Sequence, residues 1–194
     1  LDPGHMAPLL YAQLALIGKY SLEELAQLRQ WGSPTTGHPE FEVARGVENT
    51  SGPLGQGHTF AVGAAIAAKF LAAHTGNPTF AKETIYAYIS DGGIQEEISQ
   101  GAARIAAVLG LDNLIMFYDS NDIQLSTETG EVMNEDTAAK YRALGWEVLE
   151  INGNDAAEIR KAIETAKAVT GKPTLIIGKC IMGKGALKAD GTSY

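Results

Sequence analysis

Two polar turns follow predicted β-strands and carry residues that could bind a metal ion and an anion. Ser90-Asp91-Gly92-Gly93 comes directly after a predicted strand at residues 84–89, and Asn121 follows a second predicted strand at residues 113–118. Mg²⁺ prefers oxygen ligands and commonly takes one or two carboxylates, with phosphates and water completing its shell. Backbone N–H groups at the start of a helix also attract anions. Asp91 and Asn121 are therefore candidate ligands for a metal ion that is bound together with a phosphate.

The spacing of these two residues is compatible with one shared site. Asp91 and Asn121 are 30 residues apart, the length of one β-α-β unit, and ligands of parallel sheets bind outside the carboxyl ends of the strands. An ordinary structural role also fits, because Asp91-Gly92-Gly93 is a typical helix-capping turn and Asn121 is a typical loop residue. Both interpretations stay open on these residues alone.

The second half of the chain alternates strand and helix patterns, which predicts a parallel sheet covered by helices. The predicted strands are short and apolar on both faces, as buried parallel strands are. We expect strands at residues 84–89, 113–118, 146–151 and 174–181, and helices at residues 94–109, 134–144 and 155–169. An α/β fold is the expected class.

The first half of the chain predicts helices and one long loop system. Helices are expected at residues 8–17, 21–30 and 59–74, and Ser21 with Glu24 forms an S-x-x-E capping box at the start of the second. Residues 31–58 show no regular period but are dense in Gly, Pro, Thr and His. A stretch of this length is a functional loop or a wrong assignment, and we favour the functional loop.

Composition limits the classes of partner. The 194 residues carry 15 basic and 23 acidic side chains, a formal net charge of −8, which disfavours nucleic acid and anionic membranes as partners. No apolar run reaches the length of a membrane span. The single cysteine, Cys180, allows no internal disulfide, so we expect a reducing, cytoplasmic compartment. One domain without an internal boundary is the expectation for this length.

Four segments together resemble one enzyme family, the transketolases. Asp91-Gly92 followed by Asn121 is similar to the thiamine diphosphate motif G-D-G…N, although Ser90 stands where the family usually has glycine. The other three segments come in the family's order: Gly4-His5, Gly37-His38-Pro39-Glu40 and Gly52-Pro53-Leu54-Gly55-Gln56-Gly57. The likeness extends over essentially the whole chain.

The resemblance implies a fold, a function and partners. Residues 1–194 would be the diphosphate-binding domain, a doubly wound parallel sheet flanked by helices, truncated at both ends relative to the family. The complete enzyme would be a homodimer that transfers a two-carbon ketol unit from ketose phosphates to aldose phosphates. The pyrimidine-binding domain or subunit is missing from this chain, so we expect the isolated chain to be inactive.

The resemblance also implies roles for individual residues. Asp91, Asn121 and the carbonyl of Ile123 would hold Mg²⁺, for which Ca²⁺ or Mn²⁺ could substitute, and Gly92 would donate its N–H to the diphosphate. The rings of thiamine diphosphate would contact Gly52, Pro53 and Leu54. His5 would lie near the diphosphate and the reacting carbons, and His38 would hydrogen-bond the hydroxyls of the donor ketose. Glu96 would lie at the dimer interface and couple the two cofactors.

Several alternatives are weighed against this function. A 1-deoxyxylulose-phosphate synthase-like enzyme matches the two glycine-rich segments less well, and a non-catalytic binding or assembly module would be expected to lose some of the site residues. The segment from Gly178 to Gly185 is one residue short of a P-loop, because Gly185 replaces the hydroxyl that binds Mg²⁺. His58 could face the site or serve only at the start of its helix.

Overall fold

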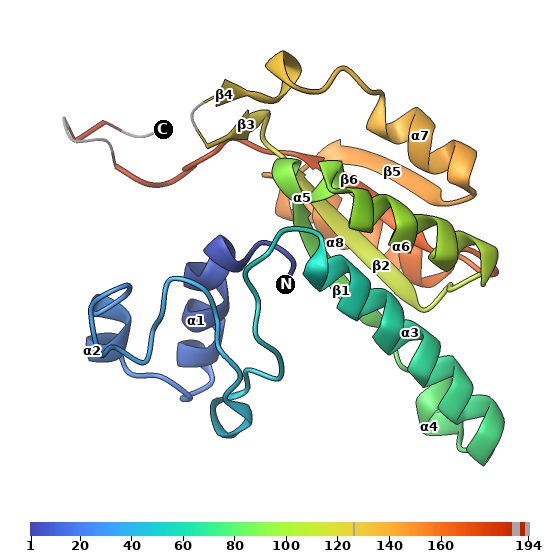
Figure 1. The fold of residues 1–194 in the computed structure, drawn as a ribbon, viewed down its shortest axis with the longest axis horizontal. Coiled ribbons are helices and arrows are strands. Elements are labelled where there is room, and N and C mark those ends of the chain that lie inside the picture. The colour runs from blue at the N-terminus through green and yellow to red at the C-terminus, as the bar shows by residue number, and fades with distance from the viewer. Residues whose placement is uncertain (126, 188–190, 193–194) are drawn as a thin grey trace.

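A parallel β-sheet forms the centre of the fold (Figure 1). The computed structural model describes residues 1–125, 127–187 and 191–192. The described residues contain one sheet of four strands, in the order β1-β2-β6-β5, and every neighbouring pair is parallel. The bounds are β1 (Ile85–Ser90), β2 (Leu114–Ser120), β5 (Glu147–Asn152) and β6 (Thr174–Lys179). The predicted parallel sheet is confirmed, with strand ends shifted by one or two residues.

Helices lie on both faces of this sheet. Helices α3, α6 and α7 cover one face, and α8 covers the other (Figure 1). The bounds are α1 (Ala7–Leu16), α2 (Leu22–Ala26), α3 (Gln56–Thr75), α4 (Pro78–Ala81), α5 (Asp91–Gln95), α6 (Glu97–Val108), α7 (Thr137–Leu144) and α8 (Ala156–Lys167). The expected α/β class with flanking helices is confirmed.

The strands alternate their side chains between two apolar cores. In β2, Leu114, Met116 and Tyr118 pack in the core beneath α3, α6 and α7, whereas Ile115 and Phe117 pack beneath α8. This alternation follows from the two-residue period of a strand. Because both sets are apolar, β2 is buried on both sides, and its carboxyl end has a fixed position at the edge of the sheet.

The N-terminal part of the chain has a small core of its own. Helices α1 and α2 and the following loop lie beside one end of the sheet (Figure 1). Tyr11, Leu14, Tyr20 and Val47 are buried together in this second core. Between residues 31 and 55, the regular structure consists of a 3₁₀ turn at Val43–Arg45 and one antiparallel bridge. The predicted long irregular segment is therefore confirmed as a loop.

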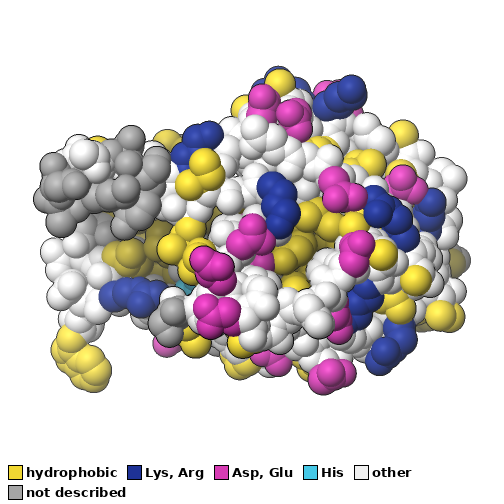
Figure 2. Space-filling view, turned by 90° about the horizontal axis from the view of Figure 1, so that it is seen from above, with side chains coloured by type: hydrophobic (Ala, Val, Ile, Leu, Met, Phe, Trp, Pro, Cys, Tyr) yellow, Lys and Arg dark blue, Asp and Glu magenta, His cyan; other side chains and the backbone are white. Residues whose placement is uncertain are grey.

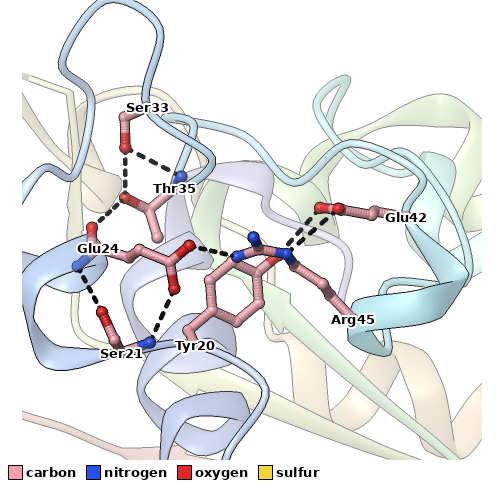
Figure 3. A network of polar contacts seen from close by, with 7 residues as sticks. All are labelled: Tyr20, Ser21, Glu24, Ser33, Thr35, Glu42 and Arg45. Atoms are coloured by element: carbon pink, nitrogen blue, oxygen red, sulfur yellow. Dashed lines mark hydrogen bonds and ion pairs between the residues drawn. The ribbon is translucent and has the colours of Figure 1, made fainter.

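A polar network holds this loop against α2 (Figure 3). Arg45 lies over the Tyr20 ring, 4.8 Å from its centroid, and its guanidinium donates to Glu24 Oε1 at 2.7 Å. The predicted capping box is present, because Ser21 and Glu24 exchange backbone-to-side-chain hydrogen bonds. Thr35, which is fully buried, donates its hydroxyl to the Glu24 carbonyl at 2.7 Å. These contacts fix the loop that carries the Gly37-His38 segment.

One predicted helix is two helices in the structure. The expected helix at residues 94–109 is wrong at its start, because α5 already begins at Asp91 and the chain is extended at Glu96 before α6. Side chains satisfy the carbonyl groups that this break leaves free. Ser99 Oγ donates to the Gly93 carbonyl at 2.7 Å, and Gln100 Nε2 donates to the Ile94 carbonyl. The predicted helix at residues 21–30 is also shorter, because α2 ends at Ala26.

His58 belongs to the core. Its side chain is fully buried in α3 and meets the Trp146 ring edge-on at 6.2 Å between centroids. Neither ring nitrogen has a hydrogen-bond partner in the described residues. Burial lowers the pKa of His58 to about 4. The interpretation in which the His58 side chain faces the site is therefore wrong.

The surface carries mixed charges. Seen from above, hydrophobic side chains lie in a recess whose rim has both acidic and basic groups (Figure 2). Among the helices that the structure describes, none has the length and apolar character required to cross a membrane.

Replacing Thr35 tests how firmly the loop is anchored. In Thr35→Val the shape is kept, but the Glu24 carbonyl loses the Thr35 hydroxyl and keeps only the Gln27 N–H as donor, so the free energy of unfolding should fall by about 0.5–1.5 kcal/mol. The matched control is Thr165→Val, because the exposed Thr165 hydroxyl also donates to a helical carbonyl, that of Lys161. Urea denaturation should show little change for this control. Equal losses in both variants would contradict the anchoring role.

The burial of His58 predicts a specific pH dependence. The unfolded chain protonates this side chain near pH 6.5 and the folded chain only near pH 4, so stability should decrease as the pH falls through this window. The decrease due to His58 should reach up to about 3 kcal/mol and level off below pH 4. Denaturation of His58→Phe at several pH values should lack this component, whereas His74→Gln, on the exposed end of α3, should retain it.

Candidate functional site

The predicted metal ligands meet at the carboxyl ends of β1 and β2. Asp91 follows β1 directly, and its two carboxylate oxygens accept from Tyr118 Oη at 2.6 Å and from the Asn121 N–H at 3.1 Å. Asn121 Oδ1 in turn accepts from the Ile123 N–H at 3.0 Å. One carboxylate, one amide and the Ile123 backbone are thus arranged in a single chain of contacts, and each oxygen keeps a second lone pair.

The environment of Asp91 suits a bound cation. The residue is 1% exposed, and burial raises the pKa of its carboxyl, while the hydrogen bonds from Tyr118 and Asn121 act in the opposite direction. A buried carboxylate is costly unless an opposite charge lies close to it. The described residues hold no cluster of three or more His, Cys, Asp or Glu side chains that could form a metal site. A divalent ion here would depend on the mixed set of carboxylate, amide and carbonyl oxygens.

Ser90 is compatible with the turn between β1 and α5. Its backbone is extended, with φ −104° and ψ 174°, so this position does not require glycine. The Ser90 hydroxyl accepts from the Gly93 N–H at 3.3 Å and caps the turn. Serine at this position therefore causes no backbone strain in the turn.

Close contacts with the backbone of Gly4 bring three predicted segments together. A Cβ built on Gly4 would lie 2.5 Å from Cδ2 of His38 and 2.8 Å from Cα of Gly52. Contacts of this length are possible only because glycine has no side chain. The Gly4-His5 turn, the His38 segment and the start of the Gly52–Gly57 loop are therefore packed against one another.

Two further contacts link the Gly52–Gly57 loop to the turn after β1. Leu54 packs on Gly92, where an added Cβ would lie 2.8 Å from Leu54 Cδ1. Gly55 faces the start of α6, where an added Cβ would lie 3.0 Å from Cβ of Glu96. The structure thus brings the residues predicted to bind the cofactor and the substrate together at one end of the sheet, namely His5, His38, Gly52, Pro53, Leu54, Gly92 and Asn121.

The two histidines are exposed on this end of the molecule. His5 and His38 lie within electrostatic range of each other, and Asp119 at the end of β2 also influences His5. Partial burial lowers the pKa of His5, and the neighbouring His38 and Arg29 lower it further. His5 is therefore neutral at pH 7 and can donate or accept a hydrogen bond. Glu96 is also exposed, at the junction of α5 and α6.

A short hairpin borders the candidate metal ligands. Strands β3 (Ile123–Gln124) and β4 (Thr127–Glu128) pair antiparallel just after Asn121. Gln95 in α5 donates to Gln124 Oε1 at 2.6 Å and to the Asp91 carbonyl at 2.9 Å. This hairpin is therefore tied to the turn that carries Asp91.

Three residues at the site are not among those that the sequence predicts to be functional. Tyr118 donates to Asp91, Gln95 joins α5 to the β3–β4 hairpin, and Asp2 lies buried beneath the Gly52–Gly57 loop. Tyr118 ends a predicted strand that leads to the site, which is a usable signal in the sequence. Gln95 and Asp2 contact groups that are distant in the chain, and no local pattern marks them.

Other features lie apart from the site. A groove of about 530 Å³ between β5 and α8, lined by residues such as Val148, Glu150 and Lys161, contains none of the predicted site residues. At the near-match to a P-loop, the described residues 181–187 form a turn and no helix follows Lys184. That segment lacks the helix N-terminus on which P-loop phosphate binding depends.

Alanine at Gly4 tests the convergence of the three segments. Its Cβ has no room against His38 and Gly52, so Gly4→Ala should lower the free energy of unfolding by about 1–3 kcal/mol. The control is Gly63→Ala, on the exposed face of α3, where an added Cβ meets no atom within 4 Å. Gly63→Ala should raise stability by about 0.5–1 kcal/mol, because alanine favours the helix. Similar effects in the two variants, measured by urea denaturation, would rule out the close contact.

Comparison with known proteins identifies relatives of the whole chain. Residues 1–194 match the family described as "Transketolase, thiamine diphosphate binding domain". A transketolase of Streptococcus pyogenes is 47% identical over 197 residues, which cover 100% of this chain and 27% of that protein. The chain thus spans less than a third of the length of this relative.

Solved transketolases share the fold. The enzyme from Leishmania mexicana has a TM-score of 0.85 and 40% identity, covering 92% of this chain and 28% of that one. A Pichia stipitis transketolase in complex with sedoheptulose 7-phosphate has a TM-score of 0.83 and 37% identity, covering 92% and 28%. The motifs, the geometry of the site and these relatives agree, and the chain belongs to the transketolase thiamine diphosphate-binding domain family.

Proposed function

We propose that residues 1–194 bind thiamine diphosphate with Mg²⁺ and, in the complete protein, take part in two-carbon ketol transfer from ketose phosphates to aldose phosphates. The observation that carries this proposal is the chain of contacts from Asp91 through Asn121 to Ile123. These contacts bring the Asp91 carboxylate, the Asn121 amide and the backbone of Ile123 together at the end of the sheet where parallel folds bind ligands. The family match supports the choice of cofactor.

The residues present fit the cofactor and the metal. Asp91, Asn121 and the Ile123 carbonyl form the oxygen set that Mg²⁺ prefers, which Ca²⁺ or Mn²⁺ also accepts. A Cβ built on Gly52 would meet no atom within 4 Å, so open space lies over this backbone for a flat ring. Pro53 and Leu54 continue the same surface, and Gly92 would offer its N–H to the diphosphate. When bound, thiamine diphosphate supplies the stabilised carbanion that the breaking of a C–C bond requires.

His5 and His38 are proposed to handle the substrate. Both are exposed beside the Gly52–Gly57 loop, and the lowered pKa of His5 keeps its imidazole neutral at pH 7. A neutral imidazole can hydrogen-bond a sugar hydroxyl as donor or acceptor and can carry a proton during the reaction. We assign the hydroxyls of the donor ketose to His38 and the region of the diphosphate and the reacting carbons to His5.

A second copy and a pyrimidine-binding domain are the proposed partners. Large apolar side chains are exposed on α3 and α6, among them Phe60, Phe70, Ile98 and Ile105, which are 51%, 62%, 51% and 51% exposed. Apolar surface of this kind is typical of an interface. Glu96 lies two residues before Ile98 at the edge of this surface, in keeping with its proposed place at a homodimer interface.

Titration calorimetry tests cofactor binding. The parent chain should release heat with thiamine diphosphate only when Mg²⁺ is present, because the metal would offset the repulsion between the diphosphate and the Asp91 carboxylate. Asp91→Ala should abolish this metal-dependent heat. Asp155→Ala is the matched control, since it also removes an aspartate between a strand and a helix, in this case between β5 and α8. No binding by the parent, even with the pyrimidine-binding domain present, would overturn the proposal.

Ketol transfer by the complete protein separates an enzyme from a non-catalytic module. His38→Ala should lower the rate of transfer from a ketose phosphate by at least about tenfold while leaving cofactor affinity unchanged. A complete protein that binds thiamine diphosphate but shows no transfer would identify a binding module.

A further inference from the structure

Asp2 is a buried carboxylate that the proposed function does not use. It is 1% exposed, and its backbone N–H donates to the Tyr88 carbonyl of β1 at 2.9 Å. The Ser51 hydroxyl donates to the Leu1 carbonyl at 2.8 Å and also lies 3.2 Å from the Asp2 carbonyl oxygen. Asp2 is thus fixed both to the strand that leads to Asp91 and to the residue that precedes the Gly52–Gly57 loop.

One oxygen of this carboxylate caps helix α3. Asp2 Oδ1 accepts from the His58 N–H at 3.1 Å in the first turn of α3. The N-cap residue of that helix is Gly55, which has no side chain to satisfy the free N–H groups. Gly57 makes the approach possible, because a Cβ there would lie 2.3 Å from Cα of Asp2. A residue 56 positions away in the chain therefore serves as the cap.

The other oxygen lies against the turn that follows β1. A Cβ built on Gly93 would lie 2.3 Å from Asp2 Oδ2, so the carboxylate packs directly on the backbone of this glycine. Oδ2 has no hydrogen-bond partner in the described residues. A buried oxygen without a partner costs free energy, and a serine hydroxyl would cap the helix without this cost. Capping alone therefore does not account for aspartate at this position.

We propose that Asp2 is a positioning residue that sets the distance between the Gly52–Gly57 loop and the Asp91–Gly93 turn. This inference rests on the proposed function, because these two segments hold the rings and the diphosphate of one cofactor. A ligand held at both ends binds tightly only when the two segments keep a fixed separation. Asp2 packs on the backbone of Gly57 in the loop and of Gly93 in the turn. It is not one of the proposed ligands of the metal or the cofactor.

The test uses Asp2→Ala and Asp2→Asn in the complete protein. In Asp2→Ala the affinity for thiamine diphosphate at saturating Mg²⁺ should fall about 10- to 100-fold, as is typical for supporting residues around a metal site. The kcat at saturating cofactor should change much less, because no reacting group is removed. Asp2→Asn keeps the shape and an oxygen for the His58 N–H, so it should recover most of the affinity.

Asn113→Ala is the matched control for lost stability. Asn113 also joins a strand to α3, through a 3.0 Å hydrogen bond to the Ala65 carbonyl, and also has an unpartnered buried oxygen. It precedes β2 and therefore lies at the opposite end of the sheet from the site. This variant should lose stability without losing cofactor affinity.

The outcomes separate this inference from the proposed function. If the parent binds the cofactor and Asp2→Ala binds it equally well, or loses no more affinity than Asn113→Ala does, Asp2 has no positioning role. If the parent shows no metal-dependent binding at all, the proposed function itself fails. A kcat that falls in Asp2→Ala as strongly as the affinity would also contradict positioning, because Asp2 would then act on the reaction.

Discussion

The site depends on one buried carboxylate, Asp91, held between the ends of two neighbouring parallel strands. Tyr118 and Asn121, from the end of β2 and just beyond it, donate to its two oxygens. A carboxylate that is 1% exposed is stable only where donors or a cation compensate for lost water. The donors are in place because β1 and β2 are paired in register from Ile85 with Leu114 to Ser90 with Asp119. The two apolar cores that bury this sheet therefore also determine the geometry of the proposed metal ligands.

Close packing of neighbouring segments against glycine backbone is the second constraint on the geometry of the site. The backbone of Gly4 packs against the His38 side chain and the backbone of Gly52, and Gly92 packs against the Leu54 side chain. An enzyme that binds a flat cofactor through backbone groups needs such close approach. The loop that carries His38 has little regular structure, and its position is instead fixed by the buried Thr35 and the network around Glu24 and Arg45.

The sequence predicts the fold well, and the structure brings the candidate ligand residues together, because both depend on local patterns or ordered motifs. The strands at the centre of the sheet are apolar runs in the sequence. The candidate metal ligands follow β1 and β2 closely in the chain. The break between α5 and α6 is not predictable in this way, because Glu96 is neither glycine nor proline and the side chains of Ser99 and Gln100 stabilise the break. The burial of His58 beside Trp146 and the capping of α3 by Asp2 depend on residues distant in the chain.

The position of a bound metal ion tests most directly whether Asp91, Asn121 and the Ile123 carbonyl form the metal site. Crystals of the chain grown with thiamine diphosphate and Mn²⁺, a substitute for Mg²⁺, would locate the metal by its anomalous scattering. We expect one strong peak at about 2.0–2.3 Å from an Asp91 carboxylate oxygen, Asn121 Oδ1 and the Ile123 carbonyl oxygen. A metal peak elsewhere, or bound cofactor with no metal at these three oxygens, would contradict it.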